Sequence, residues 1–254
     1  MRVTILGCGG SGGVPLIGGE WGRCDPGNPR NRRRRCSILV EDGGTALLVD
    51  TSPDCREQLL DAAVRRLDAV LFTHAHADHL HGIDDLRQVN RLMRRRLPAY
   101  ASPETLRAIR QRFEYVFAPL EPGSGFYKPA LEARPVDGPF QVGGIEVLPF
   151  AQDHGFSTTM GFRFGPVAYS TDVVALDEAA FAALAGVEVW IVDCLRREPH
   201  PTHSHLERTL GWIERAAPRR AIFTHMDVGL DYDELSRELP PRVEPAYDGL
   251  TIEI

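Results

Sequence analysis

Short runs of apolar and β-branched residues recur along the chain, and several of them stop close to a histidine or an aspartate. Residues 69–72 (Ala-Val-Leu-Phe) are followed by His74, and residues 145–148 (Ile-Glu-Val-Leu) precede His154. Short runs of this kind, bounded by polar residues, are typical of strands. Further runs occupy residues 2–6, 47–49, 167–171 and 221–224. The pattern predicts a set of strands whose ends present polar side chains.

Four helices are predicted between these strands. Ser52-Pro53 and Ser102-Pro103 each combine a preferred N-cap residue with proline at the first helical position. Asp177 begins a third helix, and Ser204 with Glu207 forms a capping box for a fourth. The first helix is expected to turn four residues to one face: Leu59, Leu60, Ala63 and Leu67.

Glycine pairs at hairpin spacing indicate which strands are neighbours. Gly43-Gly44, Gly143-Gly144 and Gly165-Pro166 each separate two strand-like runs. Hairpins give antiparallel neighbours, whereas alternating strands and helices favour parallel ones. The mixture predicts an α/β (α+β) fold with mixed sheets rather than one parallel sheet. With 254 residues and no linker-like stretch, the chain is predicted to form one domain, residues 1–254.

The segment after residues 69–72 carries four potential metal ligands within six residues. His74, His76, Asp78 and His79 occupy it in the pattern H-x-H-x-D-H. Imidazole and carboxylate together suit Zn, Mn or Fe, and alternation on an extended loop would let neighbouring side chains face two ions. A solvated histidine-rich turn is the alternative. Four ligands at this spacing favour a metal site.

Three more candidate ligands lie far apart in the sequence, each at the end of a predicted strand: His154, Asp172 and His225. Several strands that deliver side chains to one edge form a rigid scaffold for a site. Taken singly, either histidine would more often be an ordinary residue. In this order after the first motif, the set favours a shared metal site.

Composition narrows the function classes. The formal net charge of −6 argues against a surface that coats nucleic acid. Five cysteines without C-x-x-C spacing argue against a disulfide framework and fit a reducing cytoplasm. The first residues show no signal-peptide pattern, and no apolar run is long enough to span a membrane. We therefore expect a cytoplasmic protein that needs no membrane and no extended nucleic acid.

Two segments leave alternatives open. The glycine-rich stretch at residues 7–13 is no P-loop, since it lacks the lysine and the helix that follow one. It either lets the backbone bend or forms a wall of the site whose N–H groups contact a phosphate. The arginine run Arg32–Arg35 is expected to be a solvated loop, with contact to an anionic substrate as the alternative.

On these motifs the chain resembles the metallo-β-lactamase-fold hydrolases, which match it at Asp50, at residues 74–79, and at the three later ligands. The resemblance implies a four-layer αβ/βα sandwich with the site at one edge of two mixed sheets. By its ligand pattern, His74, His76 and His154 would hold one metal ion. Asp78, His79 and His225 would hold a second, and Asp172 would bridge the two. Asp50 would orient a ligand rather than bind metal.

Within this family the chain is most similar to the phosphoribosyl 1,2-cyclic phosphate phosphodiesterases of the carbon–phosphorus lyase pathway. The similarity rests on Gly13-Val14-Pro15, on D-H-x-x-G-x-x-x-L-R at residues 78–87, and on the segment that begins at His203. It implies that His203 is a catalytic histidine. Those relatives also hold a structural zinc through several cysteines and a late histidine. In this chain only Cys24 remains of the cysteines, and Val228 occupies the position of the late histidine. We therefore expect no structural zinc.

The sequence therefore predicts a phosphodiesterase that uses two divalent metal ions, Zn or Mn, with Fe or Ni as alternatives. Two such ions can activate a water molecule as nucleophile and clamp phosphoryl oxygens. Asp78 would also accept the proton of the nucleophile, and His203 would protonate the leaving group from a helix N-terminus. The expected partner is a small phosphorylated substrate, either a phosphodiester or a cyclic phosphate of ribose or nucleotide type. The oligomeric state is left open, with a homodimer as one option.

Three other functions share this fold. A thioester hydrolase of the glyoxalase type has the same ligands, and the His203 segment argues against it. A tRNA 3′-processing nuclease would need an extended RNA-gripping arm, for which residues 118–135 are too short and too little charged. A non-catalytic accessory protein of cofactor biosynthesis shares Ser52-Pro53-Asp54 but can lack part of the ligand set. The complete set here favours an enzyme.

Overall fold

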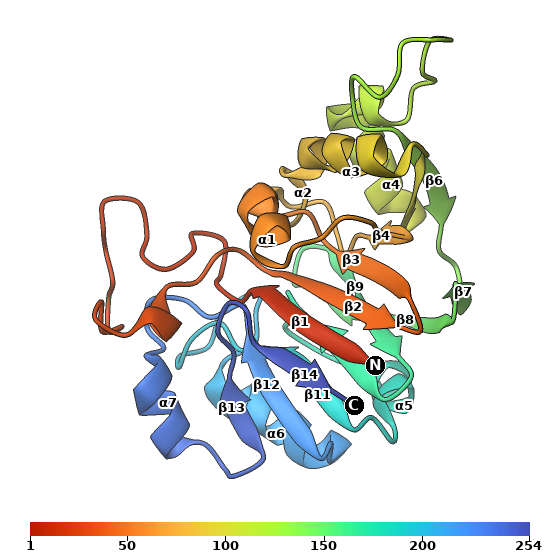
Figure 1. The fold of residues 1–254 in the computed structure, drawn as a ribbon. Helices are drawn as coiled ribbons and strands as arrows, with labels where there is room; N and C mark the ends of the chain where they lie inside the picture. The colour runs from red at the N-terminus through yellow and green to blue at the C-terminus, as the bar shows by residue number, and fades with distance from the viewer.

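Two sheets of seven strands each face one another in the computed structural model, which describes residues 1–254 (Figure 1). The first sheet has the order β14-β1-β2-β3-β4-β5-β6, and the second has the order β13-β12-β11-β10-β9-β8-β7. The first sheet consists of β1 (Arg2–Gly7), β2 (Ser37–Asp42), β3 (Thr45–Val49), β4 (Ala69–Leu71), β5 (Leu97–Ala101), β6 (Leu131–Pro135) and β14 (Thr251–Glu253). The second consists of β7 (Phe140–Val142), β8 (Ile145–Asp153), β9 (Thr158–Phe164), β10 (Val167–Ser170), β11 (Val189–Asp193), β12 (Arg220–Thr224) and β13 (Val243–Pro245).

Each sheet is antiparallel on one side and parallel on the other. Strands β14 to β3 pair antiparallel, and β3 to β6 pair parallel. Likewise, β7 to β10 pair antiparallel and β10 to β13 pair parallel. The three glycine turns join β2 to β3, β7 to β8, and β9 to β10, as the sequence predicts. The prediction of two mixed sheets is therefore confirmed.

Helices cover the outer face of each sheet and complete the four layers (Figure 1). The first sheet is covered by α1 (Cys55–Asp61), α2 (Ala77–Leu80), α3 (Leu86–Met93) and α4 (Pro103–Arg112). The second is covered by α5 (Glu178–Leu184), α6 (Leu206–Ala216) and α7 (Tyr232–Glu238). Three short 3₁₀ helices occupy Pro29–Asn31, Ile83–Asp85 and Glu114–Val116. None of the helices combines the length and the apolar character that crossing a bilayer requires.

The core lies in two apolar layers. The larger layer fills the space between the sheets and continues beneath α5 to α7, with Ile5, Val147 and Phe162 fully buried. The smaller layer lies between the first sheet and α1 to α4, where Val70 and Ile109 are fully buried. Because both faces of the central strands are covered, these strands read as continuous apolar runs, and their polar residues collect at the strand ends.

Two of the predicted helix starts are confirmed, and two are wrong. Ser102 accepts a hydrogen bond from the backbone N–H of Thr105 at 3.1 Å, and Asp177 caps α5 in the same way. Helix α1 begins at Cys55, later than Ser52-Pro53 predicts, and it ends at Asp61. Of the four residues expected on one face, Leu60 is exposed, and Ala63 and Leu67 lie beyond the helix.

The predicted capping box at Ser204 is absent because α6 begins at Leu206. Its N-cap residue is His205, whose side chain makes no capping hydrogen bond. The Ser204 hydroxyl is buried instead and accepts a hydrogen bond from the hydroxyl of Thr209 at 2.7 Å. His203 therefore lies in the loop before the helix rather than at its N-terminus.

The arginine run before β2 is not a solvated loop. Arg33 is almost fully buried, and its guanidinium donates hydrogen bonds to the backbone carbonyls of Asp227 and Leu230. Arg34 and Arg35 form ion pairs with two aspartates in the region of α1. These contacts tie the long loop between β1 and β2 to the rest of the fold, so the expectation of a solvated run is wrong.

A contrasting pair of glycines tests this packing. A Cβ atom at Gly7 would lie 2.1 Å from the backbone oxygen of Arg35, whereas one at Gly211, inside α6, would meet nothing within 4 Å. We expect Gly7→Ala to lower the free energy of unfolding by about 1–3 kcal/mol through overpacking. Gly211→Ala should raise it by about 0.5–1 kcal/mol, because alanine favours the helix. Urea unfolding followed by circular dichroism measures both, and an unchanged Gly7→Ala variant would contradict the close approach.

Candidate metal centre

All seven predicted ligands meet at one edge of the two sheets. His74 and His76 follow β4, and His154, Asp172 and His225 follow β8, β10 and β12. The remaining two, Asp78 and His79, lie in the short helix α2 rather than on an extended loop. The predicted placement at strand ends is otherwise what the structure shows.

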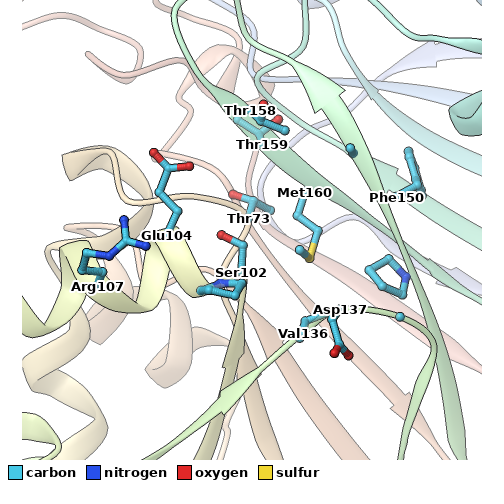
Figure 2. Close-up of a pocket in the computed structure, with 14 residues that line it drawn as sticks. Thr73, Ser102, Glu104, Arg107, Val136, Asp137, Phe150, Thr158, Thr159 and Met160 are labelled. Carbon is cyan, nitrogen blue, oxygen red and sulfur yellow. The ribbon is translucent and has the colours of Figure 1, made fainter.

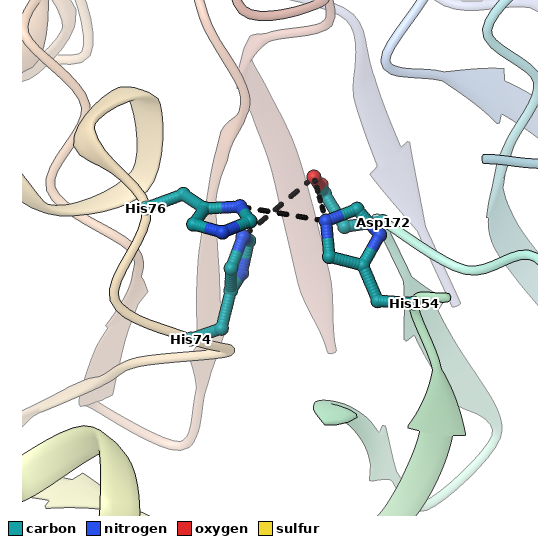
Figure 3. A group of neighbouring side chains, drawn as sticks. All are labelled: His74, His76, His154 and Asp172. Carbon is teal, nitrogen blue, oxygen red and sulfur yellow. Dashed lines mark hydrogen bonds and ion pairs between the residues drawn. The ribbon is translucent and has the colours of Figure 1, made fainter. Parts of the chain in front are cut away.

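The first group contains His74, His76, His154 and Asp172, whose ligand atoms all lie within 4.8 Å of one another. The Nε2 atoms of His74 and His154 each lie 3.7 Å from Oδ2 of Asp172. Nε2 of His154 also lies 3.4 Å from Nδ1 of His76. Figure 3 shows the rings of His74 and His76, from the segment after β4, and the ring of His154, from the end of β8, gathered around the carboxylate. Three nitrogens and one oxygen so arranged suit a divalent ion.

The second group uses the other oxygen of the same carboxylate. Oδ1 of Asp172 lies 3.0 Å from Nε2 of His79 and 3.4 Å from Nε2 of His225. Oδ2 of Asp78 lies 3.4 and 3.5 Å from the same two nitrogens. Asp172 therefore presents one oxygen to each group, which is the arrangement that a bridging ligand requires.

Several of these atoms have no hydrogen-bond partner in the protein. The Nε2 atoms of His74, His79 and His225 are buried and unpaired. Buried polar atoms are nearly always paired, so three unpaired imidazole nitrogens around one carboxylate call for a further ligand. A donor set of imidazoles and carboxylates without thiolate fits Zn or Mn and includes no soft ligand.

Asp50 orients two of the imidazoles, that of His79 directly and that of His74 through Thr73. Its Oδ2 atom lies 2.7 Å from Nδ1 of His79. The same carboxylate accepts hydrogen bonds from the backbone N–H and the hydroxyl of Thr73, both at 2.8 Å. The Thr73 hydroxyl also lies 3.0 Å from Nδ1 of His74. One buried carboxylate thus fixes the rings of a ligand from each group, and Nε2 of each ring is turned toward Asp172.

The backbone is strained at three of these positions. Asp50, Asp172 and His225 have φ values of 64°, 54° and 58°, which fall in the left-handed region that non-glycine residues rarely adopt. Each of these residues follows a parallel strand and turns the chain sharply away from it. Such conformations persist where the surrounding structure fixes them, and they concentrate at functional sites.

The charges of the site are strongly coupled. Burial alone would raise the pKa of Asp172, but the neighbouring His225 and His79 hold it well below its usual value. Burial opposes protonation of His225, yet Asp172 and Asp78 raise its pKa to about 9. Burial likewise opposes protonation of His79, whose pKa the same aspartates and Asp50 raise well above normal. Protons on these two rings balance the carboxylates, and a bound cation would take their place.

Asp193 is a site residue that the sequence analysis missed. Its Oδ2 atom lies 3.1 Å from Nδ1 of His203 and accepts the backbone N–H of Val173 at 2.9 Å. Because an ionised carboxylate only accepts hydrogen bonds, Nδ1 of His203 carries a proton. Asp193 ends the buried strand β11, so it has the same strand-end signal as Asp172.

His203 faces both groups of ligands. Its Nε2 atom lies 3.8 Å from Oδ2 of Asp172. Its ring stacks on that of His225 with centroids 4.6 Å apart and an angle of 14° between the planes. The side chain is buried. The structure places this predicted residue within reach of any group bound at the centre.

Two neighbouring surfaces border the ligands. A Cβ atom at Gly10 would lie 3.6 Å from Nδ1 of His225, so the glycine-rich turn packs against a ligand, while its contact with phosphate stays a prediction.

A separate cleft of about 500 Å³ begins at Thr73 and extends past Met160 to α4, where Arg107 lines it (Figure 2). None of the seven ligands lines this cleft.

The sequence model of the family described as the β-lactamase superfamily domain matches residues 45–226. That range spans more than half of the chain, and the chain belongs to this superfamily. The octanoyltransferase of Porphyromonas gingivalis is 35% identical over 254 residues, which is 98% of this chain and 51% of that protein. The chain thus spans about half the length of this relative.

Solved structures resemble this protein over the whole chain. A diphosphatase of the PhnP family superposes with a TM-score of 0.90 at 35% identity, covering 100% of this chain and 97% of the other. Zinc-bound PqqB of Methylobacterium extorquens superposes with a TM-score of 0.76 at 22% identity, covering 100% of both chains, and supports the fold alone.

The shared carboxylate leads to a prediction about stoichiometry. Metal-loaded wild-type protein should contain two divalent ions per chain, because each group supplies at least three protein donors. Asp172→Ala removes a donor from both groups and should reduce the content to one ion or fewer. Elemental analysis after gel filtration measures this. One tightly held ion in the wild type, unchanged in Asp172→Ala, would contradict a dinuclear site.

Proposed function

We propose that the chain is a dinuclear metal-dependent phosphodiesterase that hydrolyses a small phosphodiester or cyclic phosphate of ribose or nucleotide type. The observation that carries the proposal is His203, which is held by Asp193 and faces a carboxylate shared by two groups of metal ligands. The likeness to a PhnP-family diphosphatase over the whole chain supports phosphoryl chemistry. The expected setting is the cytoplasm, and the expected partner is a small phosphorylated molecule.

Two divalent ions held by the seven ligands would activate a water molecule and neutralise the charge of the phosphoryl group. The water oxygen forms a bond to phosphorus, and the bond from phosphorus to the leaving oxygen breaks on the opposite side. Asp78 is ionised, because the nearby His79 outweighs the effect of burial and keeps the pKa of Asp78 low. This low pKa favours Asp78 as a ligand, and its part as acceptor of the water proton stays a prediction.

His203 supplies what the leaving group needs. With Nδ1 hydrogen-bonded to Asp193, the ring can carry a second proton on Nε2 and deliver it to the departing oxygen. The Asp193 carboxylate holds the ring in one orientation, as the aspartate of a catalytic triad does. The leaving group of a thioester is a thiolate, which is stable as an anion and needs little protonation. An oriented acid therefore favours phosphodiester over thioester hydrolysis.

A panel of substrates tests the function directly. Protein loaded with Zn or with Mn should hydrolyse an aryl phosphodiester, a cyclic nucleoside phosphate or a dinucleotide bridged by diphosphate. It should not hydrolyse a glutathione thioester. Turnover of the thioester alone would replace the proposal by a glyoxalase-type function. No turnover of any substrate by protein that holds two ions would favour a non-catalytic role.

The role of His203 gives a second test. His203→Ala should keep both ions and lose about 10²–10⁴-fold in kcat on a diester with a poor alkoxide leaving group. The loss should be much smaller on an activated aryl diester, whose leaving group needs little protonation. Asp193→Asn should also lose more kcat on the diester with the poor leaving group than on the aryl diester, but the difference should be smaller. Equal losses on both substrates would indicate that His203 positions the substrate instead.

A further inference from the structure

His200 lies beside His203 and has no part in the proposed reaction. The centroids of the two rings are 5.2 Å apart, and their planes are tilted by 49°. The side chain is half-buried. No carboxylate pairs with it, and it belongs to neither group of metal ligands. The His200 ring is therefore free to form a hydrogen bond with a bound molecule.

The hydrogen bonds of His200 determine which of its nitrogens carries the proton. Nδ1 accepts the backbone N–H of Thr202 at 3.3 Å, and the Thr202 hydroxyl, which can also donate, lies at the same distance. A backbone N–H can only donate, so Nδ1 has no proton, and the proton of the neutral ring is on Nε2. Burial, together with the nearby His203 and Arg196, lowers the pKa of His200 and favours the neutral ring. No protein group accepts a hydrogen bond from Nε2.

The segment that carries His200 is fixed against the metal ligands. The carbonyl of Thr202 accepts a hydrogen bond from Nδ1 of His154 at 2.7 Å. A Cβ atom at Gly155 would lie 2.7 Å from the backbone oxygen of Pro201, so the turn after His154 packs tightly on this segment. One residue, Thr202, thus orients a metal ligand through its carbonyl and His200 through its N–H.

We propose that His200 is a substrate-binding residue whose Nε2–H donates a hydrogen bond to an oxygen of the phosphoryl group beside His203. His200 and His203 then have different roles toward the same phosphoryl group. His203 delivers a proton to the leaving oxygen, and His200 holds a neighbouring oxygen in place without titrating. This assignment deepens the proposed function and rests on it.

Two amide variants separate the binding role from a purely structural one. The side-chain amide of His200→Gln places an N–H donor near the position of Nε2. That of His200→Asn places an acceptor near the position of Nδ1, where it can keep the hydrogen bond to Thr202. The probe is inorganic phosphate, titrated into zinc-loaded protein by calorimetry, with metal content and melting temperature as controls for folding.

We expect His200→Ala and His200→Asn to weaken phosphate binding at least about tenfold, the effect of losing a hydrogen bond to a charged group. His200→Gln should stay within about threefold of the wild type. KM for a diester should follow the same order, with kcat little changed. Wild-type affinity in His200→Asn, or a His200→Gln variant no better than His200→Ala, would overturn the assignment.

A second measurement needs no variant. In zinc-loaded protein with ¹⁵N-labelled histidine, His200 should show the tautomer protonated at Nε2, and phosphate should shift that resonance. A proton on Nδ1, or no response to phosphate, would overturn the inference. Phosphate affinity does not depend on turnover. A protein that hydrolyses only thioesters would therefore refute the proposed function, while these measurements would still decide the role of His200.

Discussion

The carboxylate of Asp172 is the interaction on which the rest of the site depends. It is buried at the edge of an apolar sandwich and lies within 3.8 Å of an imidazole nitrogen from five different histidines. A buried charge of this kind is stable only when opposite charge and hydrogen bonds surround it. His79 and His225, whose pKa values are raised, supply that charge as protons, and bound cations would replace them. The two oxygens of one side chain thereby set the positions of both groups of ligands.

The sandwich makes this convergence possible. Strands β3, β4, β10 and β12 take part in the parallel regions of the two sheets, and each is followed at the shared edge by a residue of the site. Left-handed backbone at Asp50, Asp172 and His225 lets the chain leave the sheet while the side chain stays at the centre. The apolar layers on either side hold these conformations in place, so the strain at the edge is supported by the core.

The sequence predicted the strands and the ligands better than the helices and the loops. Buried strands give apolar runs that end abruptly, and the four potential ligands between His74 and His79 indicate a metal site from local sequence alone. The start of α1 could not be placed from Ser52-Pro53. The Ser52 hydroxyl accepts the backbone N–H of Asp54 at 3.1 Å and donates to the side chain of Gln58 at 2.9 Å, but this caps only a turn, and the helix begins at Cys55. The burial of Arg33 depends on carbonyls almost two hundred residues away. No local pattern predicts partners at that distance.

Asp193 is a different case, because its position after the apolar strand β11 was visible in the sequence. The motifs shared with known hydrolases mark the metal ligands, and a residue that acts on His203 rather than on a metal ion has no motif of its own. The hydrogen bonds of Thr202 are likewise visible only in three dimensions, since one peptide segment connects His154 with His200.

X-ray absorption of the metal-loaded protein tests whether the Asp172 carboxylate joins two metal ions. If Asp172 joins two ions, the zinc spectrum should show nitrogen and oxygen neighbours only, together with metal–metal scattering at about 3.5–4 Å. Replacing Asp172 by alanine should remove the metal–metal signal. A spectrum of isolated ions, or one with sulfur from Cys24 in the coordination shell, would contradict the account.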